Sequence, residues 1–471
     1  MLQTIINAWR IADLRKKILF TAFILLVFRV GSAITIPFVN IGQDGIMGNT
    51  MNDASFLSYL NMMTGEAFNY ATILAMSITP YINSSIIMQL LQVAIPALER
   101  LAKEGEEGRK KIATITRYVT IGLALMQSIA YFFYLRNGGQ TGGTLLLPDA
   151  DGNPYTGGWL LLQAVVIVAV LTAGASLTMW LGERINVNGI GNGISMILFA
   201  GIIARIPTMM SQLYSPNPQV GYISRGGVWI PLSILAGVAL LAIIAFIVWM
   251  DNAERRVPVQ YTKHVVGRKM YGGQSSHIPI KVNMSGVMPV IFASSLLSLP
   301  PTVQMFINKS KLWVDGVADG TPTGLGKFFK LFEQSNPWYL LIYFVMIIGF
   351  AYFYSSIQYD PVEMSNNIRN NHGAIPGYRP GEPTANYIRK IINRITLLGA
   401  LLLSVVALWP IVFSLLSTLV IKWSGQATEQ MSRMTIAMGG TSVIIMVGVA
   451  LETVKQLESQ MMLRHYKGFL D

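Results

Sequence analysis

The stretch that decides the fold reads Ser77-Ile78-Thr79-Pro80-Tyr81-Ile82-Asn83-Ser84-Ser85-Ile86-Ile87-Met88-Gln89-Leu90-Leu91-Gln92. It is apolar enough for a membrane helix, yet it contains proline, serine, asparagine and glutamine, whose polar groups are costly when they face lipid. One side of this helix must therefore face protein or water. At about 100° per residue, Ile82, Ile86 and Gln89 share one face, with small polar side chains beside it. This pattern suits the wall of a pore, but small hydroxylated residues also pack membrane helices together, and the helix alone does not decide between the two.

The composition of the whole chain is that of a membrane protein. Of 471 residues, 52% are hydrophobic and only 12% are charged, and the mean hydropathy is +0.48. A bilayer core of about 30 Å needs about 20 apolar residues per helix. By that length we predict an all-α polytopic membrane protein with ten transmembrane helices, at residues 18–36, 71–95, 112–135, 159–181, 194–214, 230–250, 284–306, 337–359, 395–420 and 434–451.

The distribution of basic residues predicts the orientation of the chain in the membrane. Ten spans place both termini on the same side, and 24 Lys and Arg residues lie in the segments on that side against 9 on the other. Because cytoplasmic loops carry an excess of Lys and Arg, both termini are predicted to be cytosolic. The positive cytosolic face can orient the protein against anionic lipid or dock an acidic partner.

The spans form two sets of five. We predict an N-terminal half at residues 1–213, a hinge loop at 214–229, a C-terminal half at 230–451 and a cytosolic tail at 452–471. An odd number of spans in each half is expected of an inverted, pseudo-symmetric repeat. This prediction depends on counting, because the two halves share no clear residue-level similarity.

Two long cytosolic loops, at 251–283 and 360–394, are the most polar parts of the chain. The first alternates apolar and basic residues before Tyr271-Gly272-Gly273 and predicts a β-hairpin that turns there. The second predicts a rigid turn that presents Arg379 between Gly377 and Pro380, either as a contact residue or as an ordinary solvated side chain.

The stretch between Pro37 and Tyr70 is also unusual, because it contains no Lys or Arg. Apolar residues repeat there at helical spacing, and Thr64-Gly65 marks the end of the predicted short helix. The repeating residues are Phe56, Tyr59, Leu60 and Met63. The helix is too short to cross a membrane, so it either folds back into the protein or forms an ordinary interfacial loop.

The residues that enzymes use are absent or badly spaced. There is no Cys, the four His residues have no metal-ligand spacing, and no nucleotide-binding motif is present. We therefore predict neither an enzyme nor a bound cofactor.

A secondary transporter of a small solute is the alternative function, but it usually needs ionisable residues near the membrane midplane. The spans instead place aliphatic residues beside Ser, Asn, Gln and Gly, which favours a constriction that gates by dewetting.

Seven stretches resemble the SecY/Sec61 family, which forms protein-conducting channels. They occur in order along nearly all ten predicted spans and are Ser77–Ile82, Lys103–Arg109, Gly189–Ser195, Pro279–Asn283, Ile291–Ser294, Pro376-Gly377 with Arg379–Gly381, and Gly439–Ser442. The resemblance implies two five-helix halves around a central hourglass pore. It also implies the function, which is to pass unfolded secretory polypeptides across the membrane and to release membrane-protein helices laterally into it.

The same resemblance implies roles for individual residues. An aliphatic ring that closes the pore corresponds to Ile82, Ile86, Leu198, Ile291 and Ile445, with leucine at 198 where isoleucine is usual. The short helix near residues 53–66 corresponds to a plug. The second and seventh spans correspond to a lateral gate, for which we select Asn83, Gln89, Ser294 and Ser295.

The resemblance also implies partners and a location. The partners are the SecE and SecG subunits, the SecA ATPase, the translating ribosome and the polypeptide with its signal sequence, with no direct nucleic-acid function apart from ribosome docking. The expected contacts with SecA or the ribosome are Arg255, Arg256, Arg268, Lys269 and Arg379. The expected location is the bacterial cytoplasmic membrane.

Overall fold

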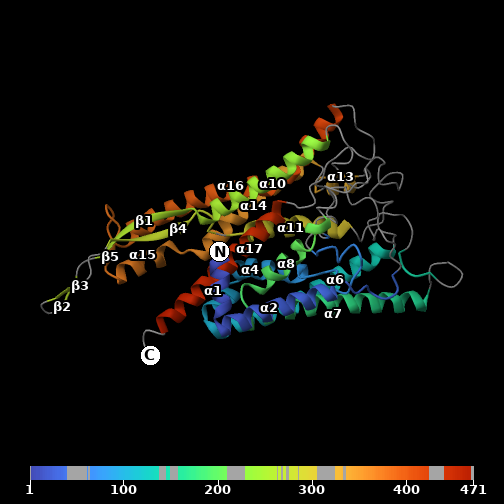
Figure 1. The fold of residues 1–471 in the computed structure, drawn as a ribbon, viewed down its shortest axis with the longest axis horizontal. Helices are drawn as coiled ribbons and strands as arrows, with labels where there is room; N and C mark the ends of the chain where they lie inside the picture. The colour runs from blue at the N-terminus through green and yellow to red at the C-terminus, as the bar shows by residue number, and fades with distance from the viewer. Residues whose placement is uncertain are drawn as a thin grey trace. The chain divides into compact units, whose positions relative to one another are not determined.

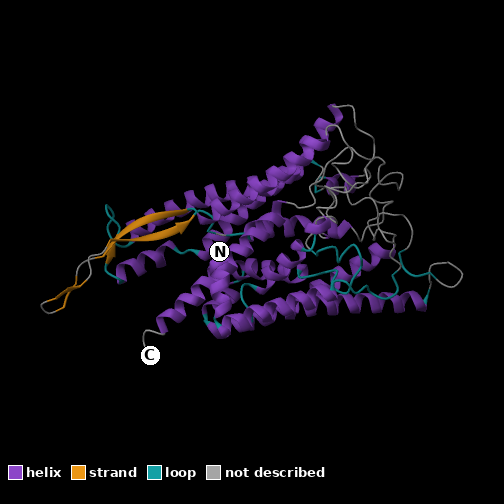
Figure 2. Cartoon of the chain, viewed as in Figure 1, coloured by secondary structure: helices purple, strands orange, loops and turns teal. Residues whose placement is uncertain are grey.

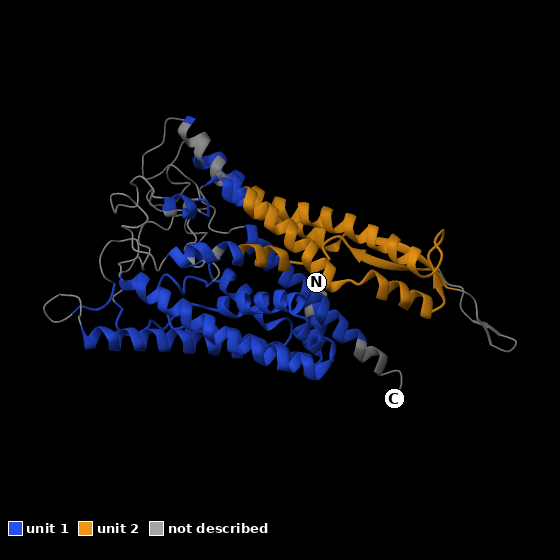
Figure 3. Cartoon of the chain, turned by 180° about the vertical axis from the view of Figure 1, so that it is seen from behind, with its two compact units in different colours: residues 1–236, 295–340, 410–471 blue, residues 237–294, 341–409 orange. Residues whose placement is uncertain are grey.

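The computed structural model describes residues 2–39, 61, 64–136, 145–148, 157–208, 229–261, 264–266, 269–271, 275–284, 286–304, 324–332, 336–423 and 440–467. The described chain is mostly helical, with a few short strands (Figure 1 and Figure 2). It divides into two compact units, coloured in Figure 3. Unit 1 comprises residues 1–236, 295–340 and 410–471, and unit 2 comprises residues 237–294 and 341–409. Unit 1 thus holds the predicted N-terminal half together with parts of the C-terminal one, and the two-half repeat stays a prediction.

Each of the ten predicted spans overlaps a helix. These helices are α2 (Ala12–Gly31), α4 (Thr79–Ala94), α6 (Glu106–Arg136), α7 (Gly158–Asn188), α8 (Gly193–Ile203), α10 (Trp229–Asn252), α11 (Met288–Gln304), α14 (Pro337–Gln358), α16 (Glu382–Trp423) and α17 (Gly440–Lys467). The described residues also form four shorter helices, which are α1 (Leu2–Arg10), α5 (Pro96–Lys103), α13 (Gly324–Lys330) and α15 (Pro361–Asn370).

The helices establish a multi-pass membrane protein. Within the described residues, 6 helices are long and apolar enough to cross a membrane, or 7 if α4 and α5, which meet at a bend of 101°, form one span. The helices α8 and α11 are apolar but shorter, and α2 begins with several charged residues. The number of ten crossings therefore stays a prediction.

Unit 1 is a helix bundle in which α6 packs along α7 and α4 packs against α6 (Figure 1). In its core the Tyr131 hydroxyl donates to the Phe68 carbonyl at 2.7 Å, and the two rings meet edge to face. The N-terminal helix α1 (Leu2–Arg10) contacts α2 and α17. It buries Ala8 and leaves Ile6 and Trp9 exposed.

The second span differs from its prediction. Helix was expected from residue 71, but residues 64–78 form an irregular segment, nearly all of it buried, and α4 begins only at Thr79. Ala71 and Ser77 have φ values of 41° and 47°, which an α-helix does not accommodate. Pro80 lies in the first turn of α4, where its missing N–H leaves no hydrogen bond unmade. We call residues 64–78 the buried segment.

The backbone of the buried segment finds its partners in the chain that follows α2. The Ile36 N–H donates to the Ala71 carbonyl at 2.9 Å, and the Ile73 N–H donates to the Ile34 carbonyl at 2.9 Å. Non-helical backbone at membrane depth is tolerated only where protein or water satisfies it. Protein contacts therefore allow this apolar sequence to leave the helix.

The glycine-rich connection between α7 and α8 is shorter than predicted. A loop was expected over 182–193, but α7 continues to Asn188 because nothing in its sequence stops it before the glycines. The chain then reverses through Gly191, whose φ is 84°. Asn192 caps α8 by accepting a hydrogen bond from the Ile194 N–H at 3.1 Å. A Cβ at Gly193 would collide with the Gly182 carbonyl, so a tight return does require glycine.

Unit 2 carries the strands, which gather at one of its ends (Figure 2). A three-stranded sheet in the order β4-β1-β5 joins β1 (Glu254–Tyr261), β4 (Ser275–Lys281) and β5 (Gly373–Ala374), and a separate pair joins β2 (His264–Val266) and β3 (Lys269–Tyr271). Both sheets are antiparallel.

The sheet links the two long polar loops through one apolar core. Val257 and Val259 of β1 are buried with Ile388 and Ile392 of α16. The predicted hairpin is confirmed, but its place of reversal is wrong. β2 pairs with β3, with Val266 opposite Lys269, so the chain has already reversed before it reaches the predicted turn at Tyr271-Gly272-Gly273.

Candidate functional site

Four of the five predicted ring residues lie in unit 1 and are buried there. Ile82 and Ile86 lie one turn apart on α4, Leu198 on α8 and Ile445 on α17, and none is more than 7% exposed. Helices α8 and α17 pack against each other. These side chains therefore face protein rather than lipid, and a closed ring stays a prediction.

Ile291, the fifth ring residue, lies on the part of α11 that belongs to unit 2. It is 7% exposed, and its neighbour Phe292 meets Phe350 of α14 edge to face at 5.8 Å. The ring of Phe292 also lies edge to face with Tyr354 at 6.2 Å. Aromatic packing thus fixes the turn of α11 that carries Ile291.

The four predicted lateral-gate residues differ in their surroundings. Asn83 is buried, and its Oδ1 makes no hydrogen bond within the described residues. Gln89 is half-buried and donates to Ser85 at 3.5 Å. Ser294 is buried and donates to the Ile291 carbonyl at 2.9 Å, while Ser295 is half-buried. Small polar groups thus border the buried aliphatic face of α4, as the sequence predicts.

The predicted plug residues Phe56, Tyr59, Leu60 and Met63 lie outside the described residues. The chain after them is described from Thr64 onward, and it enters the buried segment through Gly65, whose φ is 65°. The short helix predicted before Thr64-Gly65 stays a prediction.

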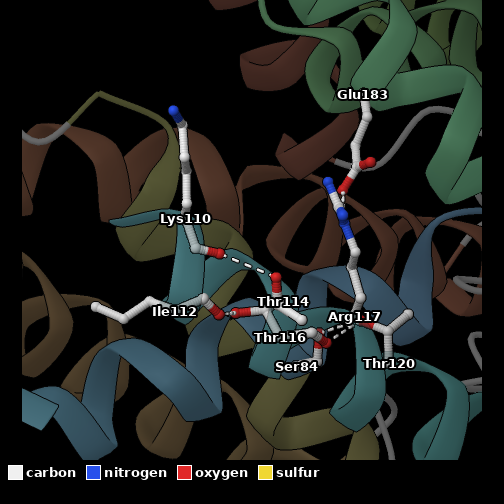
Figure 4. Close-up of polar contacts among 8 residues, drawn as sticks. All are labelled: Ser84, Lys110, Ile112, Thr114, Thr116, Arg117, Thr120 and Glu183. Carbon is white, nitrogen blue, oxygen red and sulfur yellow. Dashed lines mark hydrogen bonds and ion pairs between the residues drawn. The ribbon is translucent and has the colours of Figure 1, made fainter. Parts of the chain in front are cut away.

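The packing face of α4 is polar, and Figure 4 shows the side chains involved. The hydroxyls of Ser84 on α4 and Thr120 on α6 lie 2.5 Å apart, and both residues are fully buried. Thr120 also donates to the Thr116 carbonyl at 2.7 Å. Ser84 therefore packs α4 against α6, as the packing interpretation of this stretch predicts, and the pore wall stays a prediction.

Arg117, which lies within a predicted span, is paired. Its Nε donates to Glu183 Oε1 of α7 at 2.7 Å, and the side chains are 47% and 27% exposed (Figure 4). This ion pair joins α6 to α7 at the outer surface of the bundle.

Among the predicted SecA or ribosome contacts, three side chains are described, and all are exposed. Arg255 and Arg256 lie on β1, where Arg256 donates to Glu254 at 2.8 Å. Arg379 lies in the turn before α16. Arg268 lies outside the described residues, and Lys269 lies on β3 with its side chain outside them.

The turn that presents Arg379 is rigid. Gly377 and Gly381 have φ values of 87° and 109°, which other residues rarely adopt. The Thr384 hydroxyl donates to the Arg379 carbonyl at 2.8 Å, and the Ser365 hydroxyl donates to the Gly381 carbonyl at 2.8 Å. The predicted rigid turn is thus observed.

Sequence reasoning missed one buried ion pair. Glu66 of the buried segment and Arg205, just beyond α8, lie 3.5 Å apart with side chains 20% and 7% exposed. Arg205 is one of the nine basic residues assigned above to the outer side, but it lies within the predicted span 194–214 and its side chain is buried in unit 1, so eight remain there. One isolated charge in each of two apolar stretches was the signal that could have found the pair.

The described residues include no group of three or more His, Cys, Asp or Glu that could hold a metal ion. What the site offers is a set of buried aliphatic side chains bordered by small polar ones. Such a surface excludes water and resists ions without binding either.

Comparisons with known proteins give these residues a context. The sequence profile of the SecY family matches residues 72–454. The chain is 42% identical over 473 residues to the protein translocase subunit SecY of Mycobacterium tuberculosis, and 40% identical over 478 residues to that of Halalkalibacterium halodurans. Both matches cover 100% of each chain.

The fold is similar to those of solved channels. A protein-conducting channel matches with a TM-score of 0.61 at 17% identity, covering 95% of this chain and 92% of the other. A SecY structure concerned with its plug domain matches with a TM-score of 0.58 at 16% identity, and Sec61 in a canine ribosome-channel complex with 0.58 at 15%. Each of these two covers 95% of this chain and 92% of the other.

The fold is therefore that of a helical membrane channel. The chain belongs to the SecY family of protein translocase subunits.

Proposed function

We propose that this chain is the pore subunit of a bacterial protein translocase. It passes unfolded secretory polypeptides across the cytoplasmic membrane and releases membrane-protein helices laterally into the lipid. The end-to-end similarity of about 40% to translocase subunits carries this proposal. The small-solute transporter has no such support, because the relatives found are translocase subunits and channels.

The buried aliphatic side chains supply the seal. In the resting channel Ile82, Ile86, Leu198, Ile291 and Ile445 form a dewetted constriction, which blocks ions because nothing there replaces their hydration. An extended polypeptide crosses by displacing these side chains, and no residue needs to recognise its sequence. Leu198 keeps the seal because leucine and isoleucine are apolar and similar in volume.

A plug and a lateral gate complete the channel. The plug of a SecY relative is described as stabilising the closed state and maintaining a membrane seal. Residues 53–66 serve as the plug in this chain, and its apolar residues are Phe56, Tyr59, Leu60 and Met63. The gate lies between α4 and α11, where Asn83, Gln89, Ser294 and Ser295 give a signal sequence a partly polar passage to lipid.

The partners bind the cytosolic face. A relative of this fold was solved in a ribosome-channel complex. The ribosome or the SecA ATPase binds a set of basic residues in this chain, which are Arg255, Arg256, Arg268, Lys269 and Arg379. SecE and SecG are the companion subunits.

The energy for transport comes from these partners or the membrane potential, since the channel has no cofactor and no catalytic activity of its own. Both termini lie in the cytosol, and the basic face contacts anionic lipid.

The seal is tested by resting conductance. Ile86→Asn introduces a polar amide at the constriction and is expected to let the resting channel conduct ions in planar bilayers, while Ile86→Leu stays closed because it remains apolar. The asparagine variant is also expected to accept precursors with defective signal sequences. Wild-type conductance from a folded Ile86→Asn protein would contradict the proposal.

A further inference from the structure

We propose that Asn283 and Asp251 position the start of α11 against the sheet, so that a partner bound to the long polar loops acts on α11 through them. The proposal rests on the function proposed above, which names that partner. It gives a positioning role to two residues that belong neither to the aliphatic ring nor to the docking surface.

The exposed docking residues and the chain before α11 belong to one packed body. All of them lie in unit 2, drawn in orange in Figure 3. On β1, Arg255 and Arg256 are exposed, while Val257 and Val259 are buried in the core that β1 shares with α16. Met284, which precedes α11, is buried in the same core. Because protein interiors are close-packed, a load placed on β1 by a bound partner reaches the chain before α11.

This chain is fixed where it leaves the sheet. The Val282 N–H donates to the Ala253 carbonyl at 2.9 Å, and Asn283 Nδ2 donates to Asp251 Oδ1 at 3.4 Å. In addition, a Cβ on Gly399 of α16 would collide with the Val282 carbonyl, so the two backbones touch. Residues 282 and 283 are therefore held by the end of α10 and by α16, and we call these two residues the joint.

The chain that leaves the joint enters α11. This helix carries Ile291 of the predicted ring and Ser294 of the predicted gate. On the same turns, the Phe292 ring packs edge to face with Phe350 and Tyr354 of α14. The joint and this aromatic packing together position the part of α11 that lies in unit 2. A partner bound to β1 thus acts on the predicted ring and gate residues of α11 through the joint.

Stability alone does not explain the amide at residue 283. The Asn283 side chain is 7% exposed, and its hydrogen bond to Asp251 is long at 3.4 Å. Its Oδ1 makes no hydrogen bond within the described residues. A buried acceptor without a partner is destabilising, whereas an apolar group of similar shape avoids that penalty. The amide therefore serves to direct the chain between the sheet and α11 rather than to stabilise the core.

The test separates partner binding from transport in the purified complete translocase. Asn283→Leu is expected to leave the affinity for SecA unchanged, because the docking residues are untouched, and to keep or raise the thermal unfolding midpoint. Transport into proteoliposomes at saturating SecA is expected to fall by about tenfold, a usual size for coupling between two sites. Asn252→Leu, the same substitution at an exposed neighbouring residue, is the control and is expected to leave transport unchanged.

A swap of the two side chains tests their contact directly. Asn283→Asp alone places two carboxylates side by side and is expected to lower transport, because like charges repel. Asp251→Asn with Asn283→Asp again pairs an amide with a carboxylate and is expected to raise transport toward the wild-type rate. If the folded swap variant transports no better than Asn283→Asp, the positioning contact is overturned.

The outcomes separate this inference from the channel proposal. If folded Asn283→Leu transports like the wild type, the joint has no such role and the channel proposal stands. Equal losses of SecA affinity and transport would make Asn283 a docking residue, and a lowered midpoint with the transport loss would make it a structural one; either result overturns the inference. Should Asn283→Leu not fold, Asp251→Leu removes the same hydrogen bond, and its wild-type transport would equally overturn the inference. If the wild type does not transport, the channel proposal itself fails.

Discussion

At the scale of single residues, the local environment decides what a side chain does. Ile86 and Ser84 lie two positions apart on α4, yet the isoleucine belongs to the predicted ring and the serine bonds Thr120 of a neighbouring helix. In the same way Arg117 is paired at the surface of the bundle and Arg205 inside it. Residue type alone does not distinguish these cases, because each depends on the helix that lies opposite.

Glycine at close helix contacts is the first point to test. A Cβ on Gly174 of α7 would collide with the Ile73 carbonyl of the buried segment, so Gly174→Ala is expected to destabilise the protein by about 1–3 kcal/mol, the usual cost of overpacking. The measurement is the thermal unfolding midpoint in detergent. Gly122→Ala on α6, where nothing lies within 4 Å, is the control and is expected to be neutral or stabilising, since alanine favours a helix by up to about 1 kcal/mol over glycine. Equal midpoints for both variants would contradict the packing argument.

At the scale of elements, the turn before α16 is held in place by side-chain hydrogen bonds and ring stacking. The Arg379 turn is held by two hydroxyl-to-carbonyl hydrogen bonds, and the adjacent Tyr378 ring stacks on Tyr387 of α16 at 4.2 Å. A preformed turn loses little conformational entropy when it binds a partner. This arrangement suits a docking residue better than an ordinary solvated one.

Charge reversal in this turn tests the docking role. Arg379→Glu is expected to block SecA-driven transport into proteoliposomes without lowering the thermal unfolding midpoint, because the exposed side chain contributes nothing to the core. Arg369→Glu, an equal charge change at an exposed residue of α15, is the control and is expected to retain transport. Wild-type transport by the Arg379 variant would refute the role.

At the scale of the whole molecule, the residues of the predicted ring are divided between the two compact units. Ile82, Ile86, Leu198 and Ile445 lie in unit 1, and Ile291 lies in unit 2. The proposed function is therefore tested by probes placed in each unit.

Under the proposed function, a passing polypeptide contacts the predicted ring residues of both units. Photocrosslinkers placed at residues 82 and 291 are each expected to capture a secretory polypeptide arrested during transport, because one lies in each unit. A crosslinker at Leu241, which is 69% exposed on α10, is the lipid-facing control and is expected to give no adduct. Absence of adducts at both 82 and 291 would place the polypeptide elsewhere.

Much of the fold follows from local sequence properties. Apolar runs of membrane length predict the helices, and alternating residues in 251–283 predict the hairpin. These properties act over a few neighbouring residues, so no tertiary information is needed. The ring residues were named from a resemblance to a family, whereas the Arg379 turn was predicted from its own glycine and proline residues. The structure buries the former and exposes Arg379, and their roles stay predictions.

What the sequence by itself determined is the class of protein, the positions of the helices and the absence of catalytic motifs, because hydropathy and motif spacing are local. Only the tertiary structure decided that residues 64–78 leave the helix and that Glu66 meets Arg205. Both depend on partners far away in the chain: the buried segment bonds to residues 34–36, and the ion pair joins two apolar stretches that no local pattern connects. A buried polar group is stable only where a bonding partner lies next to it, and the tertiary packing of the chain determines which partner that is.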